Sequence, residues 1–234
     1  MLRLLHTLSR PAMAALMLMS LASTAWCQLK IEGTRLIYQG SDKEASINVV
    51  NRSDLDTVMQ SWVSSPDEGR DTPFAIVQPL ALIPPNGQQM LRVLYAGQGL
   101  PEDKESMFWL NILEIPRKPE QADTLQFAIR QRLKLFYRPA GLPGSASAAA
   151  DGLQWRTSQP GRIEVHNPSA FHVSLVDLRL DNPGQSQQLT DYILLRPGQS
   201  LTLEAPSPLP VQSQLTFSEL TDIGLQRPHR IALP

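Results

Sequence analysis

The residues best suited to binding chemistry are concentrated in one segment near the middle of the chain, Leu125 to Arg138. Its odd positions are mostly apolar, and four of its even positions carry a positive charge. The apolar residues at its start are Leu125, Phe127 and Ile129, and the cations are Arg130, Arg132, Lys134 and Arg138. This period of two predicts a β-strand with one apolar face and one largely basic face.

The predicted strand is unusually long, since strands commonly have about five or six residues. Its four cations also lie close to a predicted domain boundary. A strand with an apolar start could extend beyond its own sheet, pair with the edge of another protein and fill that partner's pockets. The alternative is an ordinary core strand with a solvated outer face.

No motif in the sequence indicates catalysis or a bound cofactor. Gly-x-Ser-x-Gly, His-Glu-x-x-His and a phosphate-binding Gly-rich loop with Lys are all absent. The three histidines beyond the N-terminal region, His166, His172 and His229, do not have the spacing of metal ligands. We therefore expect a protein that is not an enzyme and that needs neither a cofactor nor a metal.

Residues 1–27 have the pattern of a secretory signal peptide. Arg3 and Arg10 precede an apolar run, Ala12 to Ala22, that is too short to span a bilayer comfortably. We therefore predict a secreted protein, and no later segment has the length for membrane insertion.

Two cleavage points fit this segment, one after Ala25 and one after Cys27. Lipid modification of Cys27 is disfavoured because the bulky Trp26 stands where a small residue is usual. Cleavage after Cys27 would leave a chain that starts at Gln28 and contains no cysteine, so its hydrophobic core must provide stability without a disulfide.

The charges of the chain are nearly balanced, with 21 Lys and Arg against 22 Asp and Glu. This balance gives no general attraction to nucleic acid or to an anionic membrane. A mature chain of about two hundred residues fits either one large β domain or two of about one hundred residues each.

After Gln28 the sequence consists of short alternating or β-branched runs separated by Pro, Gly, Asn and Asp clusters, which is typical of two-sheet sandwiches. Strands are predicted at Leu29–Tyr38, Ala45–Val50, Val58–Val63, Met90–Tyr95, Met107–Ile115, Leu125–Tyr137, Arg162–His166, His172–Leu180, Ser200–Glu204 and Gln214–Phe217. Small and polar residues follow Pro139 and should bury little surface. We therefore predict a domain at 28–139, a linker at 140–151 and a second domain at 152–234.

Three spaced segments of the sequence resemble the signature segments of the periplasmic pilus-assembly chaperones of the chaperone-usher pathway, the family typified by PapD. They are Gly33–Tyr38 (GTRLIY), Glu105–Pro116 (ESMFWLNILEIP) and Arg132–Pro139 (RLKLFYRP). Weaker matches follow at Arg162–Pro168, Leu195–Gly198 and Thr221–Gly224. The resemblance implies an all-β fold of two immunoglobulin-like sandwiches set at an angle, with a cleft between them.

The resemblance also implies how such a protein works. Arg35 and Lys134 match the two cleft cations that hold the C-terminal carboxylate of a pilus subunit. Leu125, Phe127 and Ile129 match the donor strand that completes the subunit's sandwich. Glu105, Arg138 and Asp222 match an ionic link between the domains. The implied partners are pilus subunits and an outer-membrane usher, and the free protein could self-associate to hide its apolar strand.

Some features set this chain apart within the family. The connection from Pro116 to Asp123 is short, which resembles the short-loop subfamily, and Arg117 and Lys118 follow Pro116 where relatives often have a second proline. The C-terminal half lacks the cysteine pair that some relatives carry. Alignment from Arg35 places the mature start at Gln28 and so favours cleavage after Cys27.

A non-catalytic periplasmic adhesion or structural β-sandwich module is the alternative function. A pilus subunit would be a single domain with its donor extension at the N-terminus. In this chain two domains are predicted and the long alternating strand lies between them in sequence, so the sequence favours the chaperone.

Overall fold

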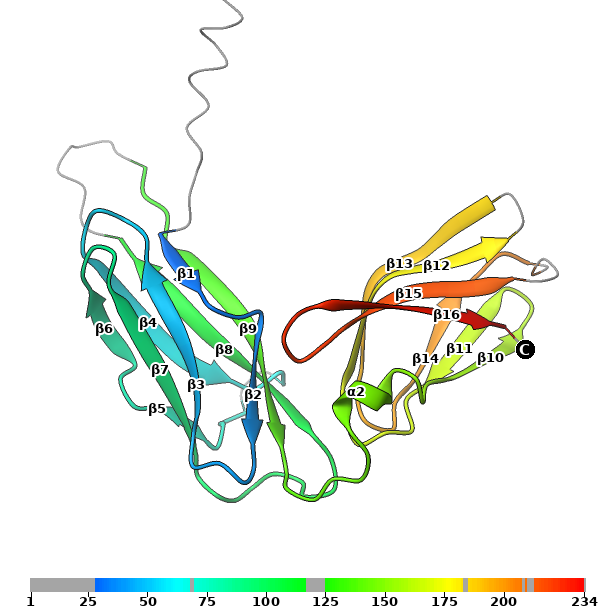
Figure 1. Ribbon diagram of the computed structural model, residues 1–234, viewed down its shortest axis with the longest axis horizontal. Coiled ribbons are helices and arrows are strands. Elements are labelled where there is room, and N and C mark those ends of the chain that lie inside the picture. Colours follow the sequence, from blue (N-terminus) through cyan, green and yellow to red (C-terminus); the bar gives the residue numbers. More distant parts are fainter. Residues whose placement is uncertain are drawn as a thin grey trace, which may run out of the picture.

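The structure is a computed structural model that describes residues 28–67, 70–116, 125–182, 185–207, 209 and 213–233, except for the side chain of Ser158. The predicted signal peptide and the connection predicted after Pro116 therefore lie outside the described residues. The described chain is built of strands, with one helix of four residues. Figure 1 shows two bodies set at an angle to each other, which agrees with the predicted all-β fold of two domains.

The N-terminal domain is a sandwich of two sheets, with strand orders β1-β3-β7-β5 and β2-β9-β8-β4-β6. The strands are β1 (Leu29–Ile31), β2 (Arg35–Gln39), β3 (Ala45–Asn51), β4 (Thr57–Ser64), β5 (Phe74–Ile76), β6 (Leu80–Ile83), β7 (Gln88–Tyr95), β8 (Ser106–Ile115) and β9 (Ile129–Arg138). Every pairing is antiparallel except that of β2 with β9, which is parallel.

Side chains on alternate positions of these strands fill the space between the two sheets. Val49 of β3, Val93 of β7 and Leu135 of β9 are completely buried and belong to one core cluster. Each side chain of this size contributes about 1.5 to 3 kcal/mol when it is fully buried. The alternation predicted for β9 therefore places Leu133 and Leu135 in the core.

The prediction of one continuous strand from Leu29 to Tyr38 is wrong. The chain leaves the first sheet after Ile31 and enters the second at Arg35, so β1 pairs with β3 whereas β2 pairs with β9. The crossing contains Gly33, where an added Cβ would lie 3.1 Å from the Ile47 side chain. A single strand would provide an edge for only one sheet, whereas the crossing gives each sheet an edge strand.

The C-terminal domain is a smaller sandwich with strand orders β10-β11-β14 and β13-β12-β15-β16. Its strands are β10 (Gln154–Gln159), β11 (Arg162–His166), β12 (Val173–Asn182), β13 (Gln185–Leu195), β14 (Ser200–Glu204), β15 (Gln214–Leu220) and β16 (Gln226–Ala232). Its core is a separate cluster that includes Leu175, Leu178 and Leu195.

Strands β5, β6, β10, β13 and β16 were not among those predicted. Most are short or rich in polar residues, as in the Gln-Ser-Gln-Gln start of β13. Strand β16 contains Pro228 and lies at a sheet edge, where a residue without an N–H group costs no ladder hydrogen bond.

The stretch 140–151 is not the poorly buried segment that its composition predicts. It contains helix α2 (Ala146–Ala149), and both Ala149 and Ala150 are buried in the C-terminal core. A small side chain such as alanine lets the backbone of this segment approach the C-terminal core closely, without leaving a void. The connection is thereby fixed to the second domain.

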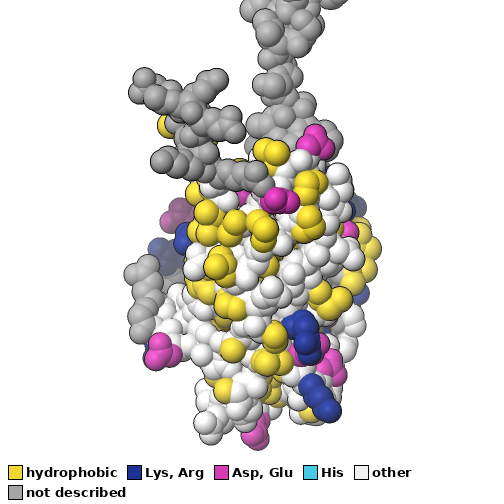
Figure 2. Space-filling view, turned by 90° about the vertical axis from the view of Figure 1, so that its left-hand side faces the viewer, with side chains coloured by type: hydrophobic (Ala, Val, Ile, Leu, Met, Phe, Trp, Pro, Cys, Tyr) yellow, Lys and Arg dark blue, Asp and Glu magenta, His cyan; other side chains and the backbone are white. Residues whose placement is uncertain are grey.

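One face of the N-terminal domain leaves apolar side chains exposed. Edge strand β6 exposes Leu80 and Leu82, which alternate along the strand with the buried Ala81 and Ile83. Figure 2 views the side of the molecule on which β6 lies in Figure 1, and hydrophobic side chains gather there. Among the described residues, no helix is long and apolar enough to cross a membrane.

Candidate functional site

Strand β9 has different neighbours along its length. It pairs with β8 from Ile129 to Tyr137, whereas its parallel pairing with β2 begins only at Lys134. The first five residues of β9, Ile129 to Leu133, therefore lie beyond the end of the β2 ladder. Backbone groups at such an edge can pair with a strand from another protein.

The segment before β9 is exposed and apolar. The structure begins the strand at Ile129, so the prediction of a strand from Leu125 is wrong for its first four residues. Leu125, Phe127 and Ile129 are exposed by 78%, 71% and 42%. A strand needs a neighbouring strand for its hydrogen bonds, and in the single chain β9 begins only where Glu114 of β8 can pair with Ile129.

Arg35 and Lys134 lie side by side, as partners in the parallel register of β2 and β9. The Arg35 guanidinium donates from Nη1 to the carbonyl of Leu220 at 3.0 Å, and its Cζ lies 5.9 Å from the centre of the Phe136 ring. Its Nε is buried without a hydrogen-bond partner in the described part of the chain. Burial lowers the pKa of Arg35, against the opposing effects of Tyr192 and three carboxylates. The guanidinium thus keeps donor capacity for an anion.

Lys134 lies close to two aromatic rings. Its ammonium nitrogen is 4.6 Å from the ring centre of Tyr192 and 5.8 Å from that of Trp109. Tyr192 belongs to β13 and so comes from the opposite domain. Sequence reasoning missed Tyr192, and no sequence signal could have found it because its meeting with Lys134 depends on the angle between the domains.

The three residues predicted to link the domains meet in the structure. Arg138 of β9 lies between Glu105 and Asp222, with Nη2 to Glu105 Oε1 and Nη1 to Asp222 Oδ2 each at 2.8 Å. Burial lowers the pKa of Arg138, but the hydrogen bonds and charges of Asp222 and Glu105 outweigh it, and the pKa is raised. The guanidinium therefore joins a carboxylate of each domain.

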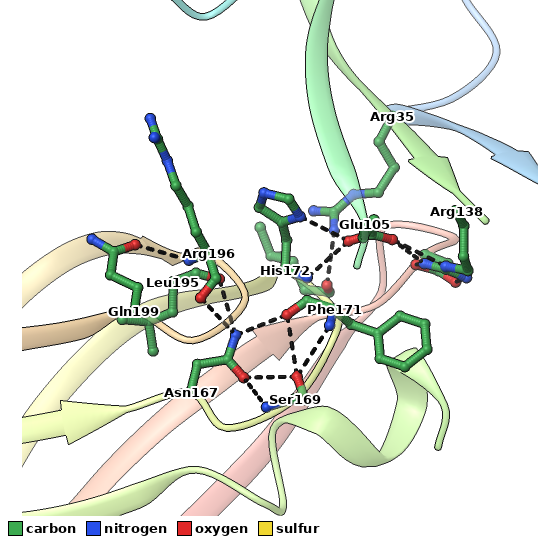
Figure 3. A network of polar contacts seen from close by, with 12 residues as sticks. Arg35, Glu105, Arg138, Asn167, Ser169, Phe171, His172, Leu195, Arg196 and Gln199 are labelled. Atoms are coloured by element: carbon green, nitrogen blue, oxygen red, sulfur yellow. Dashed lines mark hydrogen bonds and ion pairs between the residues drawn. The ribbon is translucent and has the colours of Figure 1, made fainter. Parts of the chain in front are cut away.

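His172 is a fourth member of this network, and sequence reasoning did not assign it a role. The second oxygen of Glu105 accepts the backbone N–H of His172 at 2.8 Å and lies 2.9 Å from its ring Nδ1. The ring also packs against Phe136, with centres 5.2 Å apart. Figure 3 shows Glu105 between His172 and Arg138, so both oxygens of this buried carboxylate are used.

A buried asparagine holds the loop that presents His172. Asn167 donates its amide to the carbonyls of Phe171, Leu195 and Arg196, and its side-chain oxygen accepts from Ser169 (Figure 3). The side chain is completely buried. The polar network of the interface is therefore continuous with the framework of the C-terminal domain.

The tip of the β15–β16 hairpin brings Asp222 to the N-terminal domain. Gly224 has a φ of 80° and lies against Thr34, so an added Cβ would overlap the Thr34 side chain. Thr34 directly precedes Arg35. The hairpin tip thus contacts the N-terminal domain beside a proposed anchoring cation.

A cleft of about 250 Å³ lies between the domains on this side. Arg35 and Phe136 line it from the N-terminal domain, and Leu220, Ile223 and Leu225 line it from the C-terminal domain. Lys134 does not line this cleft and faces Tyr192 instead. Among the described residues, no group of three or more His, Cys, Asp and Glu could hold a metal ion.

Family comparisons match nearly all of the chain after residue 27. Residues 28–143 match the pili and flagellar-assembly chaperone PapD N-terminal domain, and residues 148–231 match the pili assembly chaperone PapD C-terminal domain. The chaperone protein FimB/FhaD of Bordetella pertussis is 40% identical over 196 residues, which cover 78% of this chain and 80% of that protein.

Solved structures agree with this assignment. The CupB2 chaperone of Pseudomonas aeruginosa matches with a TM-score of 0.76 and 28% identity, over 88% of this chain and all of that one. The SafB chaperone of Salmonella enterica, solved in complex with the SafA pilin, matches with a TM-score of 0.74 and 26% identity over 90% of this chain and 99% of that one. The two-domain fold and the two matched domain models together show that this chain belongs to the PapD family of pilus-assembly chaperones.

Proposed function

We propose that this protein is a periplasmic chaperone that captures pilus subunits by donor-strand complementation and delivers them to an outer-membrane usher. Its signal peptide, residues 1–27, would direct export. One domain would occupy 28–139 and the other 152–234, joined by 140–151. It would act without a cofactor and without catalysis.

The observation that carries this proposal is the change of environment along β9. Apolar side chains that are exposed at Leu125, Phe127 and Ile129 run directly into a strand that is firmly held from Lys134 onward. An incomplete sandwich in a partner offers a groove that such side chains could fill. Each side chain buried there would contribute about 1.5 to 3 kcal/mol, and ladder hydrogen bonds would add affinity with little dependence on sequence.

Arg35 and Lys134 would anchor the C-terminal carboxylate of the subunit. Hydrogen bonds to charged groups contribute about 1.5 to 3 kcal/mol each, and Arg35 has an unused buried donor among the described residues. A fixed carboxylate would also set the register of the added strand, because a slip of one residue would turn the opposite side-chain face into the groove.

The link of Glu105, Arg138 and Asp222 would hold the two domains at the angle that this anchor requires. Because Asp222 is about 41% exposed at its side chain, the inner pair of Arg138 and Glu105 should contribute most. The structure of SafB with the SafA pilin supports a subunit as the partner, since SafB shares this fold.

Co-purification from cells that express the cognate pilus tests the proposal. Tagged wild-type protein, Lys134→Ala and Phe127→Asp would be isolated from the periplasm, and the bound proteins identified by mass spectrometry. We expect pilin-like subunits with the wild type and strongly reduced recovery with both variants, each of which should remain folded. Equal recovery with all three proteins would contradict both the anchor and strand donation.

A further inference from the structure

Glu114 is a buried carboxylate that neither the proposed anchor nor the domain link uses. It lies near the end of β8 on the core side, and only 7% of its surface is exposed. Its strand partners are Ile129 and Met59, neither of which is titratable. Its Oε2 has no hydrogen-bond partner in the part of the chain that the structure describes. A carboxylate this buried normally has a cationic partner.

Among the described residues, the backbone N–H groups of Leu29 and Gln28 form hydrogen bonds to Glu114. Burial raises the pKa of Glu114, and these two hydrogen bonds lower it only in part. Without a cation the site therefore favours the neutral acid.

Gln28 is held firmly beside this carboxylate. Its carbonyl accepts the N–H of Arg52 at 2.7 Å, and its side chain accepts from the Thr57 hydroxyl at 3.4 Å. Leu29 follows in β1, where its carbonyl accepts from Gln131 of β9 at 2.8 Å. The backbone nitrogen of Gln28 thus has a fixed place next to Glu114.

We propose that Glu114 is the binding site for the α-ammonium group that signal cleavage creates at Gln28. Hydrolysis of the peptide bond between Cys27 and Gln28 consumes one water, leaves a carboxylate on Cys27 and gives the nitrogen of Gln28 a positive charge. The nitrogen that was a neutral amide with one donor becomes an ammonium with three, and it can then bond both oxygens of Glu114. The inference rests on the proposed cleavage after Cys27, and it does not depend on subunit binding.

This ion pair would tie the residue before β1 to β8 at the position that pairs with Ile129, the first residue of β9. Gln131 of β9 already donates a hydrogen bond to the carbonyl of Leu29. The new ion pair would add a second link between this N-terminal segment and the sheet that contains β8 and β9. Removal of the signal peptide would thereby strengthen the framework behind Ile129, where the proposed donor segment begins. A charged amine held by Glu114 would also resist cyclisation of the N-terminal glutamine, because that reaction needs the neutral amine.

The test uses the full chain secreted and processed in the periplasm. Intact mass would identify the first residue and any loss of ammonia, and the rate of α-amine acylation as a function of pH would give the pKa of the amine. We expect a chain that begins at uncyclised Gln28 with an α-amino pKa about one unit or more above the ordinary value of about 7.7 to 8.0. In Glu114→Gln the pKa should return to that ordinary range.

A second comparison keeps the inference testable if Glu114→Gln is poorly stable. One alanine inserted before Gln28 would move the amine away, and its effect on melting temperature would be measured in the Glu114 and the Glu114→Gln backgrounds. We expect the insertion to lower the melting temperature only when Glu114 is present. The inserted protein should also lose stability as pH rises above 4.5, because the folded state then keeps a proton that the unfolded state releases.

Several results would overturn the inference: an ordinary α-amino pKa in the wild type, an equal effect of the insertion in both backgrounds, or a mature chain that is cyclised or starts at another residue. A different first residue would also contradict the proposed cleavage site. The other negative results would leave the chaperone proposal untouched, because none of them involves a subunit.

Discussion

The two ends of β9 differ in what surrounds them. From Lys134 to Tyr137 the strand pairs with both β2 and β8, and it has a hydrophobic core on one face and the second domain on the other. Toward Leu125 the same chain has exposed apolar side chains and, beyond Ile129, no strand neighbour in the described residues.

This difference shows how a stable protein can present an exposed apolar segment. We call Lys134 to Arg138 the held end of β9, and Leu125 to Ile129 the open end. The held end stabilises the fold and fixes the proposed anchoring cations, so the open end need not contribute to stability. Substitutions at the held end should therefore lower the free energy of unfolding, whereas substitutions at the open end should lower only the affinity for a subunit.

The largest effect is expected at Leu135, which is completely buried. Leu135→Ala should lower the free energy of unfolding by about 2 to 5 kcal/mol, because it removes buried methyl groups and leaves a cavity. Denaturant unfolding measures this value. Ile129→Ala is the matched control at the open end, where we expect a change of less than about 0.5 kcal/mol. Equal losses at both positions would remove the distinction between the two ends.

The next effect is expected at the domain link. Glu105→Gln should lower the free energy of unfolding by about 3 kcal/mol, because Arg138 loses its buried anionic partner and, among the described residues, keeps Asp222 as its carboxylate partner. Asp222→Asn, at the more exposed carboxylate, should cost only about 0 to 1 kcal/mol. Thermal and denaturant unfolding would compare the two, and small-angle X-ray scattering would follow the angle between the domains. A larger effect at Asp222 would reverse our order of importance.

At the open end the effect should be confined to binding. Phe127→Asp should weaken subunit binding by about 1.5 to 3 kcal/mol, since a charged group would enter the apolar groove, with unfolding unchanged. Phe127→Leu keeps an apolar side chain and should retain most of the affinity. Titration calorimetry with a purified subunit measures both, and unchanged affinity in the aspartate variant would exclude this residue from the donor segment.

The smallest effect concerns Tyr192, which contacts Lys134 across the domain boundary. Tyr192→Leu should weaken binding of a peptide that ends in a free carboxylate by about 0.5 to 2 kcal/mol, because Lys134 loses an aromatic face that helps to position it. Tyr192→Phe keeps the ring and should bind like the wild type. If the leucine variant also binds normally, the aromatic contact has no part in the anchor.

The period of two in short runs was sufficient to predict β-sandwich structure and the alternation of β9. The arrangement as two immunoglobulin-like sandwiches was predicted through the family resemblance. The sequence did not predict that the chain changes sheets at Gly33, since that crossing depends on which sheet has a free edge. It also assigned 140–151 by composition alone, whereas Ala149 and Ala150 pack into a core formed by distant residues.

Some site residues were predicted from the sequence, and the roles of others became clear only from the structure. Glu105, Arg138 and Asp222 were identified through a family resemblance, and the structure brings them together. Tyr192 and His172 have no local signal, because their roles arise only when two domains meet. Glu114 falls within a signature segment, but the sequence does not show that one of its oxygens has no hydrogen-bond partner in the described part of the chain, because that depends on how Gln28 and Leu29 lie against β8.

The most direct test of the central claim is a double-mutant cycle on the anchor. A peptide with the last residues of the captured subunit would be prepared with a free C-terminal carboxylate and as its amide, and each would be titrated into wild type and Lys134→Ala. The account predicts that amidation and Lys134→Ala each weaken binding substantially and that the second change adds little to the first. Fully additive losses would contradict the account, because Lys134 and the carboxylate would then act independently.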